Sequence, residues 1–267
     1  MIKFEEKAHK YYDDSGVWTS ATSLIARYKP KFNADEAALK ASKNRKSKWF
    51  NYDPEYIKSI WNQERDRATT LGSSYHAQRE QDLLACTTIS VDGSAISIHP
   101  CKFDDNGHKE ASSQILGPGV YPEHLIYLKS HKIAGQSDVV EVVNGKVNII
   151  DFKTNKEIKT ESYRDWKGVS QKMYAPVAHL DDCNYNHYAL QLSLYMYMIL
   201  KHNPKLKPGD LILKHIVFKK QDEDKFGYPI YELDNNGDPI VESVVIYNVP
   251  YLKKEIIEIL KDYGKNI

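Results

Sequence analysis

Two apolar runs joined by an Asn-Gly dipeptide constrain the fold of this chain more than any other stretch. The first run is 138–143, Asp-Val-Val-Glu-Val-Val, and the second is 147–151, Val-Asn-Ile-Ile-Asp. Asn-Gly between two such runs is typical of the tight turn of an antiparallel hairpin. Because side chains alternate faces along a strand, Asp151 and Lys153 share one face. The sequence therefore predicts a hairpin that brings Asp138 close to Asp151.

The paired carboxylates indicate a cation site. Two neighbouring carboxylates repel each other, and a hard divalent cation with oxygen ligands is the usual way to hold them together. Lys153, on the same face as Asp151, would then stabilise charge or activate a water molecule. The alternative is an ordinary hairpin in which Asp138 and Lys153 are solvated and Asp151 pairs with Lys153.

The hairpin resembles the metal site of the PD-(D/E)xK nuclease superfamily. In that superfamily an Asp on one strand and Asp/Glu-x-Lys on the next strand bind the metal, as Asp138, Asp151 and Lys153 would here. Ser137 stands where the nominal motif has proline. Gly135-x-x-Asp138 is similar to the form found in RecB-like members, the branch of phage and mitochondrial exonucleases.

Two further motifs of the RecB-like branch flank the hairpin in the expected order. Upstream, Gly72-x-x-x-His76 resembles a helix whose histidine joins the metal site. Downstream, Gln191 and Tyr195 are four residues apart, on one face of a predicted helix, and resemble a Gln-x-x-x-Tyr motif.

The resemblance implies an α/β fold of the restriction-endonuclease-like type, with a mixed central sheet flanked by helices. We expect a single domain over residues 1–267, with a nuclease core at 71–220 and an N-terminal strand and helix elaboration at 1–70. The implied activity is that of a metal-dependent deoxyribonuclease, an exonuclease that prefers single-stranded DNA ends. A structure-specific endonuclease of the same fold and a non-catalytic DNA-binding recombination partner are the alternatives.

The resemblance also implies roles for individual residues. One or two Mg²⁺ or Mn²⁺ ions would be bound by His76, Asp138, Asp151 and the backbone carbonyl of Phe152. The two aspartates and Lys153 would be catalytic, with the lysine orienting or deprotonating the attacking water, or stabilising the transition state.

Supporting roles fall to four more residues. Gln191 and Tyr195 would hold the site strand and touch the DNA backbone. Glu123, just before a predicted strand, would support the metal ligands from behind. Glu80, one helical turn beyond the histidine motif, would either support them in the same way or face solvent.

A basic and aromatic stretch at 40–52 indicates a second surface for DNA. The residues that we expect to contact DNA there are Lys43, Arg45, Lys46, Lys48 and Trp49. Such a mixture binds phosphates and stacks on unpaired bases. A solvated basic helix end whose aromatic residues pack on the core explains the pattern equally well.

Local signals predict other elements. Asp53 followed by proline is an N-cap and first-turn pair. It opens a long helix that we expect to bend or break at Gly72. Residues 155–186 are predicted to form a long loop with basic and aromatic side chains, and a final helix is expected over 251–263.

Composition and cysteine spacing exclude several classes of protein. The chain has 41% hydrophobic and 27% charged residues, which is typical of a globular protein, and its formal net charge of +1 does not by itself indicate nucleic acid. The three cysteines lack Cys-x-x-Cys spacing, so neither a zinc ribbon nor a four-cysteine iron-sulfur cluster is expected.

The sequence also bears on location and partners. No apolar run approaches the length of a membrane span, and the first residues lack the hydrophobic stretch of a signal peptide. We therefore expect an intracellular protein without membrane contact, in the cytoplasm of a bacterium or a phage-infected host. Because the chain lacks a P-loop motif, any unwinding of DNA would come from a partner among replication or recombination proteins.

Overall fold

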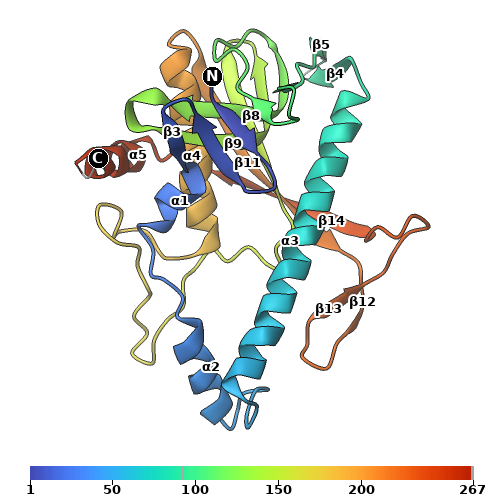
Figure 1. The fold of residues 1–267 in the computed structure, drawn as a ribbon, viewed down its shortest axis with the longest axis vertical. Coiled ribbons are helices and arrows are strands. Elements are labelled where there is room, and N and C mark those ends of the chain that lie inside the picture. Colours follow the sequence, from blue (N-terminus) through green and yellow to red (C-terminus); the bar gives the residue numbers. More distant parts are fainter. Residues whose placement is uncertain (92, 266–267) are drawn as a thin grey trace.

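A mixed sheet forms the centre of the molecule (Figure 1). The structure is a computed structural model, and it describes residues 1–91 and 93–265. The longest strands are β8 (Gly119–Leu128), β9 (Ile133–Val143), β10 (Lys146–Lys153), β11 (Lys207–Phe218) and β14 (Val241–Val249). Strands β10 and β11 run parallel, whereas β9 pairs antiparallel with both β8 and β10. The predicted α/β class with a mixed central sheet is confirmed.

Short strands extend the sheet beyond β9 in the order β3-β2-β1-β7-β6. They are β1 (Lys3–Glu5), β2 (Lys10–Asp13), β3 (Gly16–Ser20), β6 (Lys102–Phe103) and β7 (Lys109–Glu110). Two hairpins stand apart from this sheet, β4 (Thr88–Val91) with β5 (Ser94–Ser97) and β12 (Lys220–Glu223) with β13 (Pro229–Tyr231).

The predicted hairpin is confirmed in β9 and β10. Val143 pairs with Lys146 and Val139 pairs with Ile150, so the two strands leave the turn in register. The two turn residues, Asn144 and Gly145, have φ values of 50° and 72°. Positive φ at both central residues matches the right-handed twist of the strands, which explains why Asn-Gly forms this turn.

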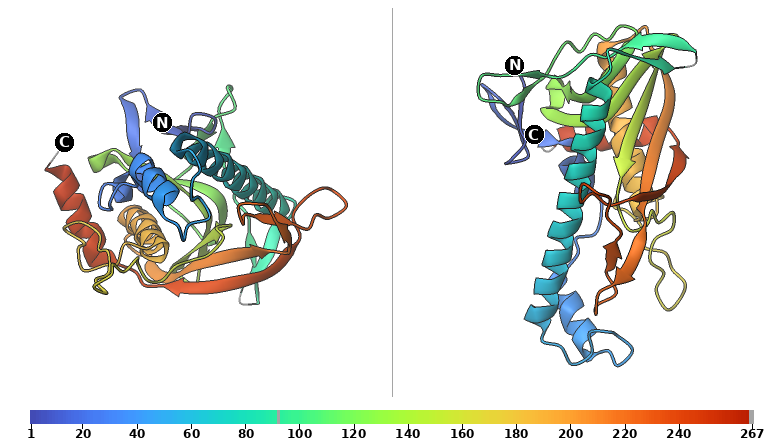
Figure 2. Two further views of the ribbon diagram at one scale, coloured as in Figure 1. Left: turned by 90° about the horizontal axis from the view of Figure 1, so that it is seen from below. Right: turned by 90° about the vertical axis from the view of Figure 1, so that its right-hand side faces the viewer.

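Helices cover the sheet, and most of the core lies beneath α4. The helices are α1 (Ala21–Ala26), α2 (Ala34–Lys43), α3 (Pro54–Leu84), α4 (Asn184–His202) and α5 (Lys253–Gly264), with a 3₁₀ turn at Lys129–His131. One side of α4 is fully apolar, and Leu190, Leu194 and Met198 on it are completely buried. Figure 2 shows α4 seated within the curve of the sheet. Burying such side chains stabilises the fold by roughly 1.5–3 kcal/mol each.

Helix α3 runs along the length of the molecule without a break (Figure 2). It begins where the sequence predicts, because the carboxylate of Asp53 accepts a hydrogen bond of 2.7 Å from the backbone N–H of Glu55. The predicted bend at Gly72 is wrong. An added Cβ at Gly72 would lie 3.2 Å from the hydroxyl of Thr154, so the glycine lets the helix approach the strand end closely.

The first half of α3 carries an arm made of α2 and the β12–β13 hairpin (Figure 1). Trp49 lies at its centre, 5% exposed, with its ring stacked 4.9 Å from that of Phe226. This corrects the prediction that Trp49 stacks on DNA bases, since the ring is already covered. The four predicted basic residues of the arm are exposed: Lys43, Arg45, Lys46 and Lys48.

Among the described residues, no helix combines the length and the apolar character needed to cross a bilayer.

Candidate metal centre

Four elements converge on one cluster of charged side chains. Asp138 comes from β9, Asp151 and Lys153 from β10, Glu123 from β8 and His76 from the middle of α3. The strand order places β9 between β8 and β10, which explains how residues far apart in sequence meet.

Glu123 faces Asp138 across the β8–β9 pair. Pro122 pairs with Val139 and His124 pairs with Ser137, so the register puts Glu123 opposite Asp138. The backbone of Glu123 has a φ of 50°, an uncommon value for a residue other than glycine. Like charges directly opposite each other destabilise a sheet, and strained backbone tends to gather at functional sites.

His76, Glu123 and Asp138 have the geometry of a metal-binding group. One potential ligand atom from each lies within 4.8 Å of the others. Nδ1 of His76 lies 3.3 Å from Oδ2 of Asp138, and the same oxygen accepts a hydrogen bond of 2.7 Å from the backbone N–H of Phe152. Two of the predicted ligands, His76 and Asp138, are therefore brought together, with Glu123 as a third member that the sequence suggested only as a support.

Asp151 lies beside this group, paired with Lys153. Oδ2 of Asp151 lies 2.5 Å from Nζ of Lys153, and the carboxylate is 2% exposed. Lys153 is therefore the close partner of this buried carboxylate. A carboxylate oxygen has two lone pairs, so the pairing with Lys153 still leaves acceptor capacity for a cation.

The backbone of Phe152 also faces the group. Its N–H reaches Asp138. Within a strand the N–H and C=O of one residue point to the same side, so the predicted carbonyl ligand faces the side of Asp138.

Burial and charge move the pKa values of the three carboxylates apart. Burial, together with the negative charge of Asp138, raises the pKa of Glu123 to about 8. Burial raises the pKa of Asp151 to about 6, although Lys153 opposes the change. Burial would also raise the pKa of Asp138, but the hydrogen bond and charge of His76 outweigh it and hold that pKa below its usual range.

The two basic side chains respond in the opposite sense. Burial would lower the pKa of Lys153, but the charges of Asp151 and Asp138 outweigh it and raise that pKa. The pKa of His76 is also raised, because the contact with Asp138 outweighs the effect of burial. Without a metal, the carboxyl groups of Glu123 and Asp151 therefore hold a proton more tightly than usual, and Asp138 holds one less tightly.

Gln191 and Tyr195 lie behind the site strand. Nε2 of Gln191 donates a hydrogen bond of 3.0 Å to the hydroxyl of Tyr195, which is 3% exposed. An added Cβ at Gly135 would lie 2.4 Å from the ring of Tyr195, so only glycine lets β9 approach this ring. The geometry supports the predicted role of holding the strand, and contact with DNA stays a prediction.

A buried lysine that the sequence did not indicate adjoins the group. Nζ of Lys109 lies 3.3 Å from Oε2 of Glu80 and 3.5 Å from Oε2 of Glu123, and the residue is 5% exposed. Glu80 thus contacts Lys109 instead of a metal ligand directly. A lysine within a two-residue strand has no periodic pattern around it, so its burial depends on tertiary pairing alone.

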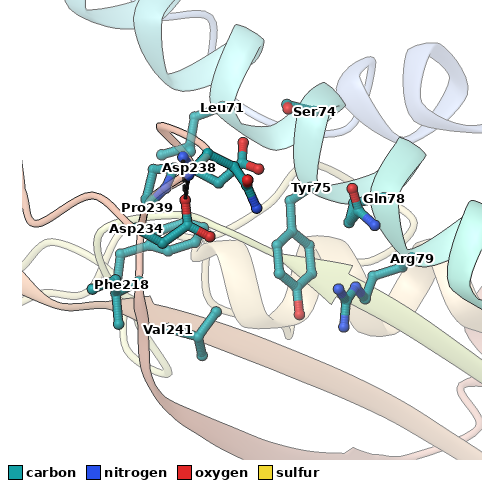
Figure 3. A pocket seen from close by; sticks show the side chains of 12 residues that line it. Leu71, Ser74, Tyr75, Gln78, Arg79, Phe218, Asp234, Asp238, Pro239 and Val241 are labelled. Carbon is teal, nitrogen blue, oxygen red and sulfur yellow. Dashed lines mark hydrogen bonds between the residues drawn. The ribbon is translucent and has the colours of Figure 1, made fainter.

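His76, Glu80, Lys109, Glu123 and Asp138 line a cavity of about 330 Å³, whereas Asp151 and Lys153 are not among its lining residues. A larger cavity, about 460 Å³, opens on another face of α3, beside Leu71, Tyr75 and Arg79 (Figure 3). The carboxylate of Asp234 in its wall accepts hydrogen bonds from the backbone N–H groups of Asn236 and Asp238, so this acid has a structural role in its own turn. The smaller cavity, which contains the histidine and facing carboxylates, is the better candidate for chemistry.

The basic residues of the arm are not part of this centre. His76 lies 22 residues beyond the start of α3 at Pro54, which corresponds to about 33 Å along the helix axis. Residues 43–48 lie beyond that start, at the far end of the arm (Figure 1).

Comparisons with known proteins leave the family open. No family model matches the chain, and no curated protein matches it. Among solved structures, the chain is similar to the crystal structure of SSO0001, with 14% sequence identity and a TM-score of 0.31. The likeness covers 92% of this chain and 75% of that chain. A TM-score this low supports no conclusion about fold family or function.

Proposed function

We propose that this protein is a metal-dependent nuclease of the restriction-endonuclease-like type that hydrolyses DNA phosphodiester bonds. The observation that carries the proposal is the meeting of His76, Glu123 and Asp138 next to the Asp151–Lys153 pair on adjacent strands. Lys153 already pairs with Asp151, but the crowding of Glu123 and Asp138 at one place is costly unless a further cation compensates it.

The donor set suits a hard divalent ion. Carboxylate oxygens and one imidazole favour Mg²⁺ or Mn²⁺, whereas softer ions favour thiolates, which the group lacks. His76, Glu123 and Asp138 would hold the ion, and a carboxylate oxygen of Asp151 and the carbonyl of Phe152 would complete its ligands.

Each side chain would contribute separately to phosphodiester hydrolysis. A bound ion of this kind would polarise the phosphate and make a bound water more acidic. Asp138 is fixed by the N–H of Phe152 and by His76, which preorganises the site. The raised pKa of Lys153 keeps its ammonium charged. This favours a lysine that orients water and stabilises negative charge over one that accepts a proton.

The substrate and mode of cleavage rest on the resemblance of the motifs. Gly72, His76, the Asp151-x-Lys153 strand and the helix with Gln191 follow the order of RecB-like exonucleases. We therefore propose action on DNA ends, with a preference for single strands. An endonuclease of the same fold is the alternative within enzymes, and a non-catalytic DNA-binding partner is the alternative outside them.

One digestion experiment separates these proposals. End-labelled single-stranded and duplex DNA and closed circular DNA are incubated with Mg²⁺, Mn²⁺ or chelator. The variants are Lys153→Ala and, as a matched control, Lys146→Ala at the exposed start of the same strand. We expect metal-dependent loss of linear DNA only, abolished by Lys153→Ala and retained by Lys146→Ala. Cleavage of circles would indicate an endonuclease, and binding without cleavage would refute the enzyme.

A further inference from the structure

Lys109 is held in the metal centre by the sheet itself. It lies on β7, which pairs with β1 on one side and β6 on the other, and its Cα partner on β1 is Phe4. The end of β7 is fastened by Lys3, whose Nζ lies 3.6 Å from Glu110. The lysine is therefore fixed in position, and its ammonium lies in the same cavity wall as His76 and Asp138.

The ammonium contacts two carboxylates of that wall at once. Nζ of Lys109 lies 3.3 Å from Oε2 of Glu80 and 3.5 Å from Oε2 of Glu123, so the two carboxylates share one positive charge. Glu123 belongs both to this pair and to the group with His76 and Asp138. A carboxylate has two oxygens, so one can face the lysine while the other faces an ion.

The charges of the centre balance for one divalent ion. Asp151 and Lys153 form an ion pair that cancels. The remaining acids, Glu80, Glu123 and Asp138, carry three negative charges, and Lys109 supplies one positive charge. With His76 neutral, as metal binding requires, a net charge of about −2 remains, which one divalent ion compensates.

We propose that Lys109 is a built-in cation of the metal centre: its ammonium neutralises Glu80 and Glu123, so that the centre binds a single divalent ion in place of two. The inference rests on the proposed function and specifies how many ions that site takes. Without the ammonium, the half-buried Glu80 and the buried Glu123 would lose the counter-charge that they share. Two-ion sites hold their ions about 3.5–4 Å apart with shared ligands, and Glu123 is placed to be shared.

Equilibrium dialysis of the full-length, metal-free protein against Mn²⁺ alone tests this role. The wild type and Lys109→Arg, which keeps the charge, are expected to bind one ion per chain. Lys109→Met removes the charge and is expected to bind two. Adding Glu80→Gln to Lys109→Met removes one ligand of the second ion, so the double variant is expected to return to one. Circular dichroism and thermal melts check that each variant is folded.

The outcomes separate the role of Lys109 from the proposed function. Two ions in the wild type, or one ion in folded Lys109→Met, would overturn the built-in cation, and DNA cleavage by the same wild-type preparation would still support the nuclease. A wild type that binds no Mn²⁺ would overturn both. If Lys109→Met does not fold, Lys109→Gln, which also removes the charge but keeps a polar side chain, is measured in its place: two ions support the proposal, and one ion overturns it.

Discussion

Replacing Glu123 with glutamine should stabilise the metal-free protein at alkaline pH. In the folded chain the pKa of Glu123 is raised from its ordinary value of 4.5 to about 8, because the carboxyl is buried and faces Asp138. The folded protein therefore keeps a proton that the unfolded chain releases between these values. Stability from this group is complete below pH 4.5 and is lost as the pH rises to 8.

The size of the effect follows from the pKa difference. One pKa unit corresponds to about 1.4 kcal/mol, so a rise from 4.5 to about 8 sets an upper limit of about 5 kcal/mol. Glutamine keeps the shape and carries no charge at any pH. Asp151 and Asp138 contribute their own pH dependence to both proteins, so the difference between variant and wild type isolates Glu123 to first order.

Urea denaturation in chelator, followed by tryptophan fluorescence at pH 5 and pH 8, measures this difference. We expect Glu123→Gln and the wild type to have similar free energies of unfolding at pH 5, with the variant more stable by several kcal/mol at pH 8. Glu242→Gln, on the exposed face of β14, is the control that should change little. Added Mn²⁺ should raise the free energy of unfolding of the wild type more than that of Glu123→Gln. An equal difference at both pH values would refute the reasoning.

Three more predictions follow from close packing and from the proposed metal. Gly135→Ala places a Cβ 2.4 Å from a buried ring and should destabilise the fold by about 1–3 kcal/mol in urea, whereas Gly117→Ala, with open space around it, should change stability little. Trp49→Ala should cost about 3–5 kcal/mol, because the ring is 5% exposed, while Trp166→Ala, at 88% exposed, should stay within about 0.5 kcal/mol by thermal or chemical denaturation. Chelation should abolish DNA cleavage by the wild type, and added Mn²⁺ should restore that cleavage. The Lys153→Ala variant should stay inactive after Mn²⁺ is added, and cleavage that survives chelator would contradict a metal-dependent site.

The parts of the fold that the sequence predicted are those set by local chemistry. The β9–β10 hairpin follows from two alternating runs and a turn that needs positive φ. The start of α3 follows from a cap at Asp53. In both cases the residues that determine the structure are neighbours in the chain, so the local sequence is enough to predict it.

The features that could not be predicted from the sequence depend on contacts between residues that are far apart in the chain. Trp49 is buried by Phe226, which comes from a hairpin 177 positions later. Helix α3 continues through Gly72, where an added Cβ would lie 3.2 Å from the hydroxyl of Thr154, a residue 82 positions later. Lys109 enters the centre only because a two-residue strand pairs with β1. Glu123 is the partial exception, since an acid at the start of a predicted strand indicated a supporting role before the register placed it opposite Asp138.

Helix α3 ties the candidate metal centre to the arm. Its second half supplies His76, and its first half supplies Ile57 to the buried cluster around Trp49. The continuous helix spans 19 residues from Ile57 to His76, which fixes a separation of about 29 Å along its axis. The exposed basic residues 43–48 are therefore held at a set distance from the centre, and under the proposed nuclease function they would bind phosphates remote from the reacting bond. Such contacts would raise affinity in a salt-dependent way without entering the chemistry.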